Sequence, residues 1–189
     1  MHPTFSRALS GPIQANVLVA LCDCTRFMQS SRGRPSAQLF ADLNELYVMT
    51  DDAVGAAGGL VVKFMGDAAL VVFPEELADQ GIMALLDLKS NVDRWLRDRP
   101  IGDSLHVNVH FGEVTLGRMG RAGHLDVIGE TVNIAATLGA RGFGLSQQAF
   151  RCLSPEHRRL FHRFTPPVLY LPATSSGSER GMPGDERRA

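Results

Sequence analysis

Apolar residues along this chain recur with two different periods, one typical of strands and one typical of helices. A nearly continuous apolar run at residues 13–24 predicts a strand that is covered on both faces, and apolar runs at 60–64 and 68–73 predict two further strands. Between the first two runs, apolar residues recur every three or four positions, which predicts an amphipathic helix with Ser36 as its N-cap. Gly58 ends this helix, and the next two runs form a hairpin.

The second half of the chain continues this alternation. We expect a helix over residues 77–96, a strand over 105–111 that leads into a further hairpin, a short helix over 129–138 and a last strand over 168–171. The resulting order, βαββαββαβ, predicts an α+β fold in which helices pack on one face of a largely antiparallel sheet.

Composition limits the class of protein and its partners. The chain has 189 residues, 44% of them hydrophobic, which suffices for one domain with a core. We expect an N-terminal extension at 1–12, this domain at 13–172 and a disordered tail at 173–189, rich in Ser, Gly, Pro and charge. A net charge of −1 and the lack of a long apolar run favour neither nucleic acid nor membrane as a partner. With no signal-peptide pattern and three cysteines interpreted as core residues, the sequence predicts a cytoplasmic protein.

Two aspartates follow apolar, strand-like runs and precede a break in the pattern. Asp23 ends the first strand, and Asp67 lies in the turn of the hairpin. Carboxylates delivered by adjacent strand ends can hold two hard divalent cations close together, as in-line attack on a phosphate requires. From spacing alone, a pair of solvated turn aspartates is the alternative interpretation, and both stay open.

Three segments carry a resemblance to the catalytic domain of class III nucleotide cyclases. Residues 21–27 (Leu-Cys-Asp-Cys-Thr-Arg-Phe) resemble the family's first metal motif, in which a phenylalanine follows the aspartate by four positions. Residues 58–69 are similar to the hairpin that carries the second metal aspartate, and residues 109–117 with 125–136 resemble the central hairpin and nucleotide helix. The resemblance covers about residues 17–171 and implies a ferredoxin-like βαββαβ core.

The same resemblance implies a homodimer with catalytic sites at the subunit interface. Asp23 and Asp67 of one chain would bind two Mg²⁺ or Mn²⁺ ions per site, and Phe27 and Gly66, in the same motifs, would contact the nucleotide. Asn133 would help to orient the ribose, whose 3′-hydroxyl attacks the α-phosphate while pyrophosphate leaves.

Lys63 and Asp126 are charged residues in otherwise apolar strands, where a charge needs water or a partner. They resemble the family's base-reading residues, in which the lysine donates to a ring nitrogen and the aspartate accepts from an exocyclic amine. This pattern fits adenine, so ATP is the expected substrate. Cytosine presents a similar pattern and CTP stays open, whereas guanine and uracil each offer a carbonyl where Asp126 needs a donor.

The chain departs from the family at two positions that stabilise phosphate charge. One turn past Asn133, where the family has an arginine, this chain has Thr137, and the family's late lysine has no clear counterpart in residues 162–167. Losing such a contact costs on the order of 10²–10³ in rate. Arg141 is the candidate replacement for the arginine and Arg163 for the lysine.

The sequence therefore predicts a nucleotide cyclase of intracellular signalling that acts on ATP. Two alternatives stay open. One is a degenerate cyclase domain that binds nucleotide or a partner with little turnover, which Thr137 and the missing lysine favour. The other is a pyrimidine cyclase acting on CTP or UTP.

Overall fold

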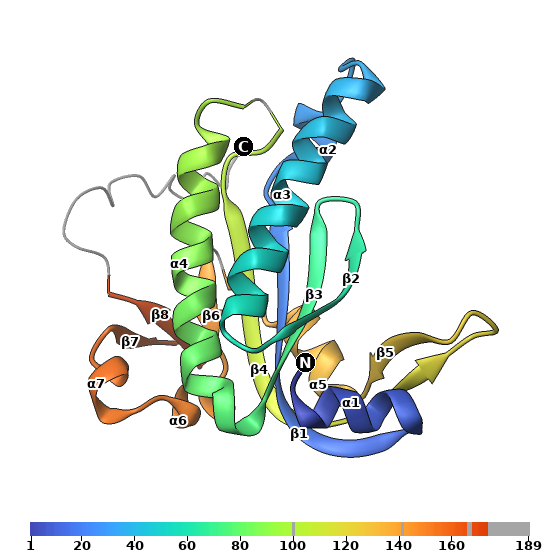
Figure 1. Cartoon of the computed structure of the whole chain (residues 1–189). Helices are drawn as coiled ribbons and strands as arrows, with labels where there is room; N and C mark the ends of the chain where they lie inside the picture. Colours follow the sequence, from blue (N-terminus) through green and yellow to red (C-terminus); the bar gives the residue numbers. More distant parts are fainter. Residues whose placement is uncertain (100, 141, 166–167, 174–189) are drawn as a thin grey trace, which may run out of the picture.

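One eight-stranded sheet organises the chain, and Figure 1 shows its helices around it. The structure, a computed structural model, describes residues 1–99, 101–140, 142–165 and 168–173. The strand order is β2-β3-β1-β4-β6-β8-β7, with β5 paired to β4 outside this path. The β4–β6 pair is parallel and the other described pairs are antiparallel. This confirms the predicted α+β fold with a mostly antiparallel sheet.

The first strands form as the apolar runs predict. They are β1 (Ile13–Cys24), β2 (Leu60–Met65) and β3 (Ala68–Pro74). β1 lies between β3 and β4, so its successive side chains enter two different cores. Leu18 and Ala20 belong to the larger core, whereas Val17 and Val19 belong to the smaller one on the opposite face.

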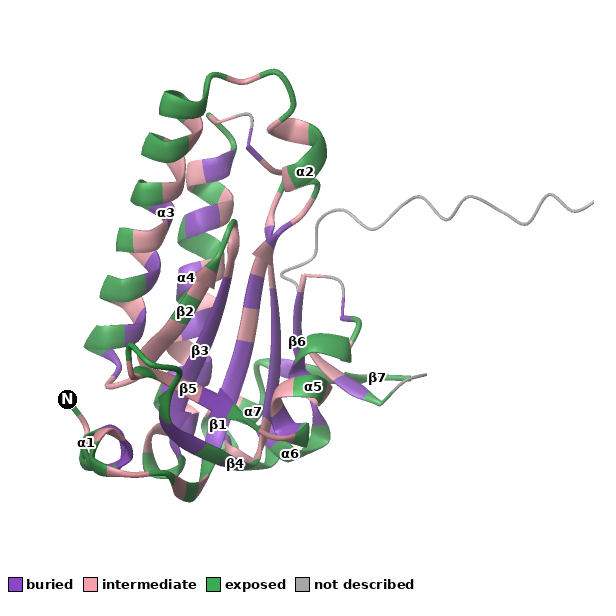
Figure 2. Cartoon of the chain, turned by 90° about the vertical axis from the view of Figure 1, so that its right-hand side faces the viewer, coloured by how far each residue is buried: buried purple, intermediate pink, exposed green. Residues whose placement is uncertain are grey.

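Helices cover both faces of the sheet, not one face as the sequence predicted. Helices α3 (Ser36–Ala56) and α4 (Ala78–Leu96) lie side by side over the larger core (Figure 1). Helices α1 (Pro3–Ser10) and α5 (Glu130–Thr137) contribute Phe5, Ala8 and Ala135 to the smaller core. Figure 2 shows α5 across the sheet from α3. Helix α1 lies within the segment expected as an N-terminal extension, and its short amphipathic pattern packs Phe5 fully out of solvent.

The central hairpin is longer than the pattern of residues 105–117 suggests. β4 runs without interruption over Leu105–Met119 and turns into β5 (His124–Ile128). Two short helices occupy connections, namely α2 (Phe27–Ser30) and the 3₁₀ helix η1 (Glu75–Leu77). The predicted Ser36 cap is wrong by one residue, because Pro35 takes the extended N-cap conformation and Ser36 is the first helical residue.

The C-terminal third contains one element that the sequence predicted and four that it did not. The last strand, predicted over 168–171, is β8 (Leu169–Pro172). The four others are β6 (Phe143–Leu145), α6 (Gln147–Cys152), α7 (Pro155–Arg158) and β7 (Phe161–Phe164). Each of these four is too short for a helical or strand period to show. Ser146 and Ser154 cap α6 and α7 through their side chains. Residues 174–189, most of the predicted disordered tail, lie outside the described residues.

The helices of the described segments are all too short or too polar to cross a lipid bilayer. Cys22 and Cys24 are buried on β1 as free thiols, in agreement with their interpretation as small core residues. Burial raises the pKa of each thiol to about 12, so both stay protonated at neutral pH.

Candidate active site

Asp23 and Asp67 come together at one end of the sheet. Asp23 is the next-to-last residue of β1, and Asp67 lies in the turn between β2 and β3. Because β1 pairs antiparallel with β3, with Cys22 opposite Ala69, this turn lies beside the end of β1. The Cys24 N–H donates a hydrogen bond to Asp67 Oδ2 at 3.0 Å. The second carboxylate is therefore held against the residue that follows the first.

The surroundings of Asp23 and Asp67 disfavour the negatively charged form of both carboxylates. Partial burial raises the pKa of Asp23, and the charge of His106, its register partner on β4, opposes that rise. Partial burial also raises the pKa of Asp67, where hydrogen bonds from backbone N–H groups oppose the rise and the Asp23 charge adds to it. A bound cation would stabilise the ionised form of both groups.

Two half-buried carboxylates are a donor set that fits Mg²⁺ or Mn²⁺. Within the described segments, no three His, Cys, Asp or Glu side chains gather to hold a metal by themselves. Mg²⁺ often takes only one or two carboxylates and completes its shell with substrate phosphates and water. Asp23 and Asp67 can thus hold a cation whose remaining ligands are water or the phosphates of a nucleotide, and their role as metal ligands stays a prediction.

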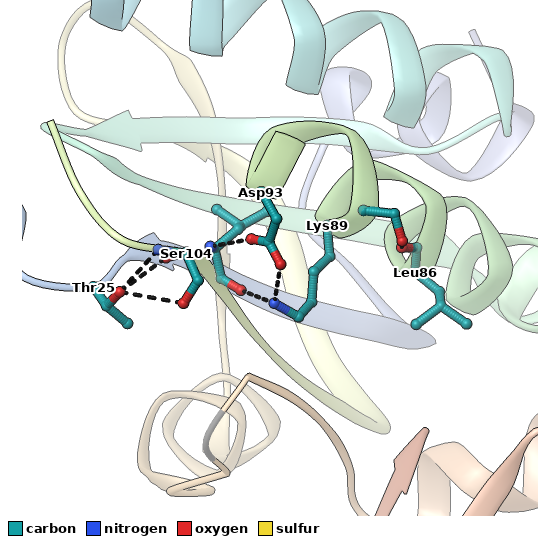
Figure 3. A network of polar contacts seen from close by, with 7 residues as sticks. Thr25, Leu86, Lys89, Asp93 and Ser104 are labelled. Atoms are coloured by element: carbon teal, nitrogen blue, oxygen red, sulfur yellow. Dashed lines mark hydrogen bonds and ion pairs between the residues drawn. The ribbon is translucent and has the colours of Figure 1, made fainter. Parts of the chain in front are cut away.

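A polar network fixes the end of β1 to the start of β4 (Figure 3). The Thr25 N–H donates to the Ser104 carbonyl at 2.9 Å, and the Ser104 N–H donates to Thr25 Oγ1 at 3.1 Å. The next residue, Leu105, donates its N–H to Asp93 Oδ1 at 2.7 Å and accepts from Lys89 Nζ at 2.9 Å. Asp93 and Lys89 also form an ion pair on α4. The end of β1 is therefore anchored to both β4 and α4.

Phe27 and Gly66 are close in sequence to Asp23 and Asp67, respectively. Phe27 begins α2, and its partly buried ring packs against the larger core. Arg26, just before it, has a φ of 58° and forms an ion pair with Asp103 at 2.9 Å. Gly66 has a φ of 67°, which glycine adopts without the strain that a side chain would add. Contact of Phe27 or Gly66 with a nucleotide stays a prediction.

Lys63 and Asp126 form an ion pair from two strands that are not sheet neighbours. Lys63 Nζ on β2 lies 2.7 Å from Asp126 Oδ2 on β5, and both side chains remain partly open to solvent. Partial burial opposes ionisation of Asp126, but the hydrogen bonds from Lys63 and the Val127 N–H, with the Lys63 charge, outweigh it and lower its pKa. The pair thus presents a donor and an ionised acceptor side by side, as the reading of one base requires.

The positions predicted to orient the ribose and to stabilise phosphate charge lie on α5 and β7. Asn133 and Thr137 are exposed on α5, and the Thr137 hydroxyl donates to the Asn133 carbonyl at 2.8 Å. Thr137 therefore bonds within its own helix and offers no charge. Arg163 is exposed on β7, the outermost strand on its side of the sheet. Arg141 lies outside the described residues, and its proposed role stays a prediction.

The sequence did not reveal the residues that support the carboxylates. Tyr47 lies at an apolar position in the helical pattern of α3, yet its hydroxyl donates to the Gly66 carbonyl at 2.7 Å. Thr25 and Ser104 are ordinary loop residues by sequence. No local signal relates residues so far apart in the chain, because their contacts arise only from the packing of separate elements.

Known proteins are similar to this chain in sequence and in fold. The family described as the Adenylate and Guanylate cyclase catalytic domain matches residues 12–163. An adenylate cyclase of Anabaena cylindrica is 25% identical over 130 residues, which cover 64% of this chain and 26% of that protein. A bacterial light-regulated adenylyl cyclase superposes with a TM-score of 0.75 at 19% identity, over 86% of this chain and 53% of that one. The guanylyl cyclase Cya2 superposes with a TM-score of 0.71 at 18% identity, over 85% and 92%.

These likenesses differ in what they show. The match spans about a quarter of the length of the curated relatives. The superposed structures, adenylyl and guanylyl cyclases alike, show the fold. The family match covers most of the chain and includes the carboxylates and the Lys63–Asp126 pair. The chain belongs to the family of adenylate and guanylate cyclase catalytic domains, as the three sequence motifs predicted.

Proposed function

We propose that this chain is a nucleotide cyclase that converts a nucleoside triphosphate, with ATP preferred, into the 3′,5′-cyclic nucleotide and pyrophosphate. The hydrogen bond from the Cys24 N–H to Asp67 Oδ2 carries this proposal, because it holds one carboxylate beside the strand end that bears Asp23. Since ATP is abundant inside cells, the proposal includes a cytoplasmic location and a role in intracellular signalling.

The two carboxylates would hold two Mg²⁺ or Mn²⁺ ions per site. The cations supply positive charge that neutralises the triphosphate and lowers the pKa of the attacking hydroxyl. Asp23 and Asp67 bind and position that charge, and the Thr25–Ser104 network keeps the Asp23 strand end in place. Asn133, exposed on α5, orients the ribose so that its 3′-hydroxyl lies in line with the bond to pyrophosphate.

The Lys63–Asp126 pair supports the preference for ATP. Lys63 has donors left beyond its bond to Asp126, and one can reach a ring nitrogen. Asp126, whose pKa is lowered, stays ionised at neutral pH and accepts from an exocyclic amine. Adenine offers both groups in adjacent positions. Cytosine does too, so CTP is the substrate to compare, and the related structures include guanylyl as well as adenylyl cyclases.

We propose a homodimer in which each site combines residues of two chains. Met65, Met119 and Ile128 are each about half exposed and lie on the two hairpins that carry Lys63 and Asp126. Covering these side chains would remove their apolar surface from water, which favours association. A second copy would cover them while completing the site with its own carboxylates.

Thr137 favours a second candidate, a cyclase domain that binds nucleotide but turns it over slowly. The Thr137 hydroxyl donates to the Asn133 carbonyl, and this side chain has no positive charge with which to stabilise phosphate. Two features count against this candidate. Asp67 is held beside the strand end that bears Asp23, and Lys63 forms an ion pair with Asp126.

The test is to incubate the full chain with each of the four nucleoside triphosphates and Mn²⁺, and to identify products by mass. Cyclic AMP from ATP is expected, and Asp67→Ala should abolish it because a ligand and its charge are lost. A cyclic pyrimidine product would replace ATP with CTP or UTP as substrate. Nucleotide binding without any product would support the slow or degenerate domain and overturn the enzyme proposal.

A further inference from the structure

We infer that Tyr47 is a positioning residue that fixes the Asp67 carboxylate for cation binding by holding the β2–β3 turn from the α3 side. This inference rests on the proposed role of Asp67 as a metal ligand. Tyr47 itself touches neither carboxylate through a described hydrogen bond, so its effect passes through the backbone of the turn.

The contact is direct and local to the turn. The Tyr47 hydroxyl donates to the Gly66 carbonyl at 2.7 Å, on the peptide unit that leads into Asp67. Met65 and Gly66 are exposed, and a side chain at Gly66 would meet nothing within 4 Å. Packing therefore does little to fix this turn, and its geometry depends on its hydrogen bonds.

Ring stacking orients the hydroxyl. The Tyr47 ring lies parallel to that of Phe64, at 3.8 Å between centroids and 7° between planes. Phe64 follows Lys63 on β2, and the two side chains point to opposite faces of the sheet. The stack thus fixes the Tyr47 ring against the same strand that presents Lys63.

Asp67 is consequently held from two sides. The Cys24 N–H of β1 fixes its side chain, and Tyr47 of α3 fixes the backbone before it. The negative charge of Asp67 also acts on Tyr47, since burial and then that charge raise the pKa of its phenol. A protonated phenol is the form that donates to the Gly66 carbonyl.

The chain provides a matched control. Tyr170 on β8 stacks on Phe150 in the same way, at 3.8 Å and 8°, and its hydroxyl bonds to no described residue. Tyr47→Phe and Tyr170→Phe therefore each remove one hydroxyl from an equivalent stack, but only the first removes a bond to the turn of Asp67.

The experiment titrates Mn²⁺ alone into the full-length protein and follows free Mn²⁺ by electron paramagnetic resonance. We expect Tyr47→Phe to weaken Mn²⁺ binding by about 10-fold, the usual scale for losing a group that supports a metal ligand. Tyr170→Phe should bind as the wild type does, and Asp67→Ala should lose the site. Hydrogen exchange of the 60–74 segment should rise in Tyr47→Phe without a comparable change in thermal midpoint.

The outcomes separate this inference from the proposed function. Unchanged Mn²⁺ affinity in Tyr47→Phe, equal weakening in Tyr170→Phe, or no binding by the wild type would each overturn the inference. Cyclic nucleotide formation with an unchanged Mn²⁺ affinity in Tyr47→Phe would leave the enzyme proposal intact. A 10-fold loss of Mn²⁺ affinity in a protein that forms no cyclic product would leave the inference intact and reject the enzyme proposal.

Discussion

Single residues on β4 show how the two faces of the sheet differ. Leu105, Val107 and Val109 enter the larger core beneath α3 and α4. The alternating residues point to the other face, where His106 is the register partner of Asp23 and His110 is buried. His110 Nδ1 hydrogen-bonds Ser146 Oγ at 2.8 Å. A buried histidine with a neutral partner makes stability sensitive to acid, since protonation would place a charge inside the protein.

We predict that His110→Asn reduces the loss of stability in acid. Burial lowers the pKa of His110, and the charge of Glu130 opposes that shift only in part. The unfolded chain therefore binds the proton more readily, so this stabilisation is present above the ordinary pKa near 6.5 and is lost as pH falls through it. Between about pH 7 and about pH 5, the thermal midpoint of the variant should fall less than that of the wild type.

The matched control is His162→Asn, which alters an exposed histidine on β7. It should leave the pH dependence of the thermal midpoint as it is in the wild type. Identical curves for wild type and His110→Asn would show that another group causes the acid sensitivity.

At the scale of elements, the ends of the strands are held by hydrogen bonds to neighbouring strands and helices. The end of β1 bonds to the start of β4, which in turn is bracketed by Lys89 and Asp93 of α4 (Figure 3). The β2–β3 turn is held by α3 and β1. Backbone groups at these ends lack ladder partners, and such groups need another partner when they are buried. The same bonds position the residues proposed to act on the substrate.

Thr25→Val should lower both the proposed cyclase activity and the stability of the fold. The variant keeps the shape of the side chain but removes the hydroxyl that accepts from the Ser104 N–H. Losing that partner should cost about 1–2 kcal/mol in the free energy of unfolding. Because the strand end that bears Asp23 loosens, turnover should fall by about 10-fold or more.

Thr25→Ser restores the hydroxyl and provides the control. Cyclic product formation and urea unfolding, measured on both variants, check this prediction. If the serine variant lost as much activity as the valine variant, the hydrogen bond would not be the cause.

At the scale of the whole molecule, the proposed site residues lie in two separate places on the described chain. Asp23 and Asp67 lie beside each other at one end of the sheet, whereas the ion pair proposed to read the base lies across β2 and β5 beside exposed apolar side chains. The proposed homodimer would place the carboxylates of one chain against the α5 residue Asn133 of the other. A closed two-fold dimer would then contain two equivalent sites.

Mixing two inactive variants tests this assembly. Asp67→Ala and Asn133→Ala should each be nearly inactive alone, because every site carries the defect. In a mixed dimer one site carries both substitutions and the other carries none, so an equal mixture should regain about a quarter of wild-type activity, given random pairing. The measurement is cyclic product formation after joint refolding or coexpression. No recovery, with mixed dimers demonstrated, would indicate that each chain forms its own site.

The main elements could be predicted from sequence because they depend on neighbours in the chain. The apolar run of β1, the helical spacing of α3 and α4, and Gly66 in its turn are local features, and the structure reproduces them. Most of the segment 143–172 could not be predicted in this way, with the last strand, β8, as the exception. Its strands and helices are only a few residues long, so they gain stability from packing and not from a period of their own.

The sequence by itself determined the family, the main strands and helices between residues 13 and 138, the last strand, and the identity of the candidate site residues. Tertiary structure decided which of them meet: Asp67 with the Cys24 N–H, Lys63 with Asp126, and Tyr47 with the Gly66 carbonyl. It also decided that α1 and α5 cover the second face. The physical reason is that register and packing relate residues far apart in the chain, whereas the signals in a single sequence extend only over a few neighbouring turns or strands.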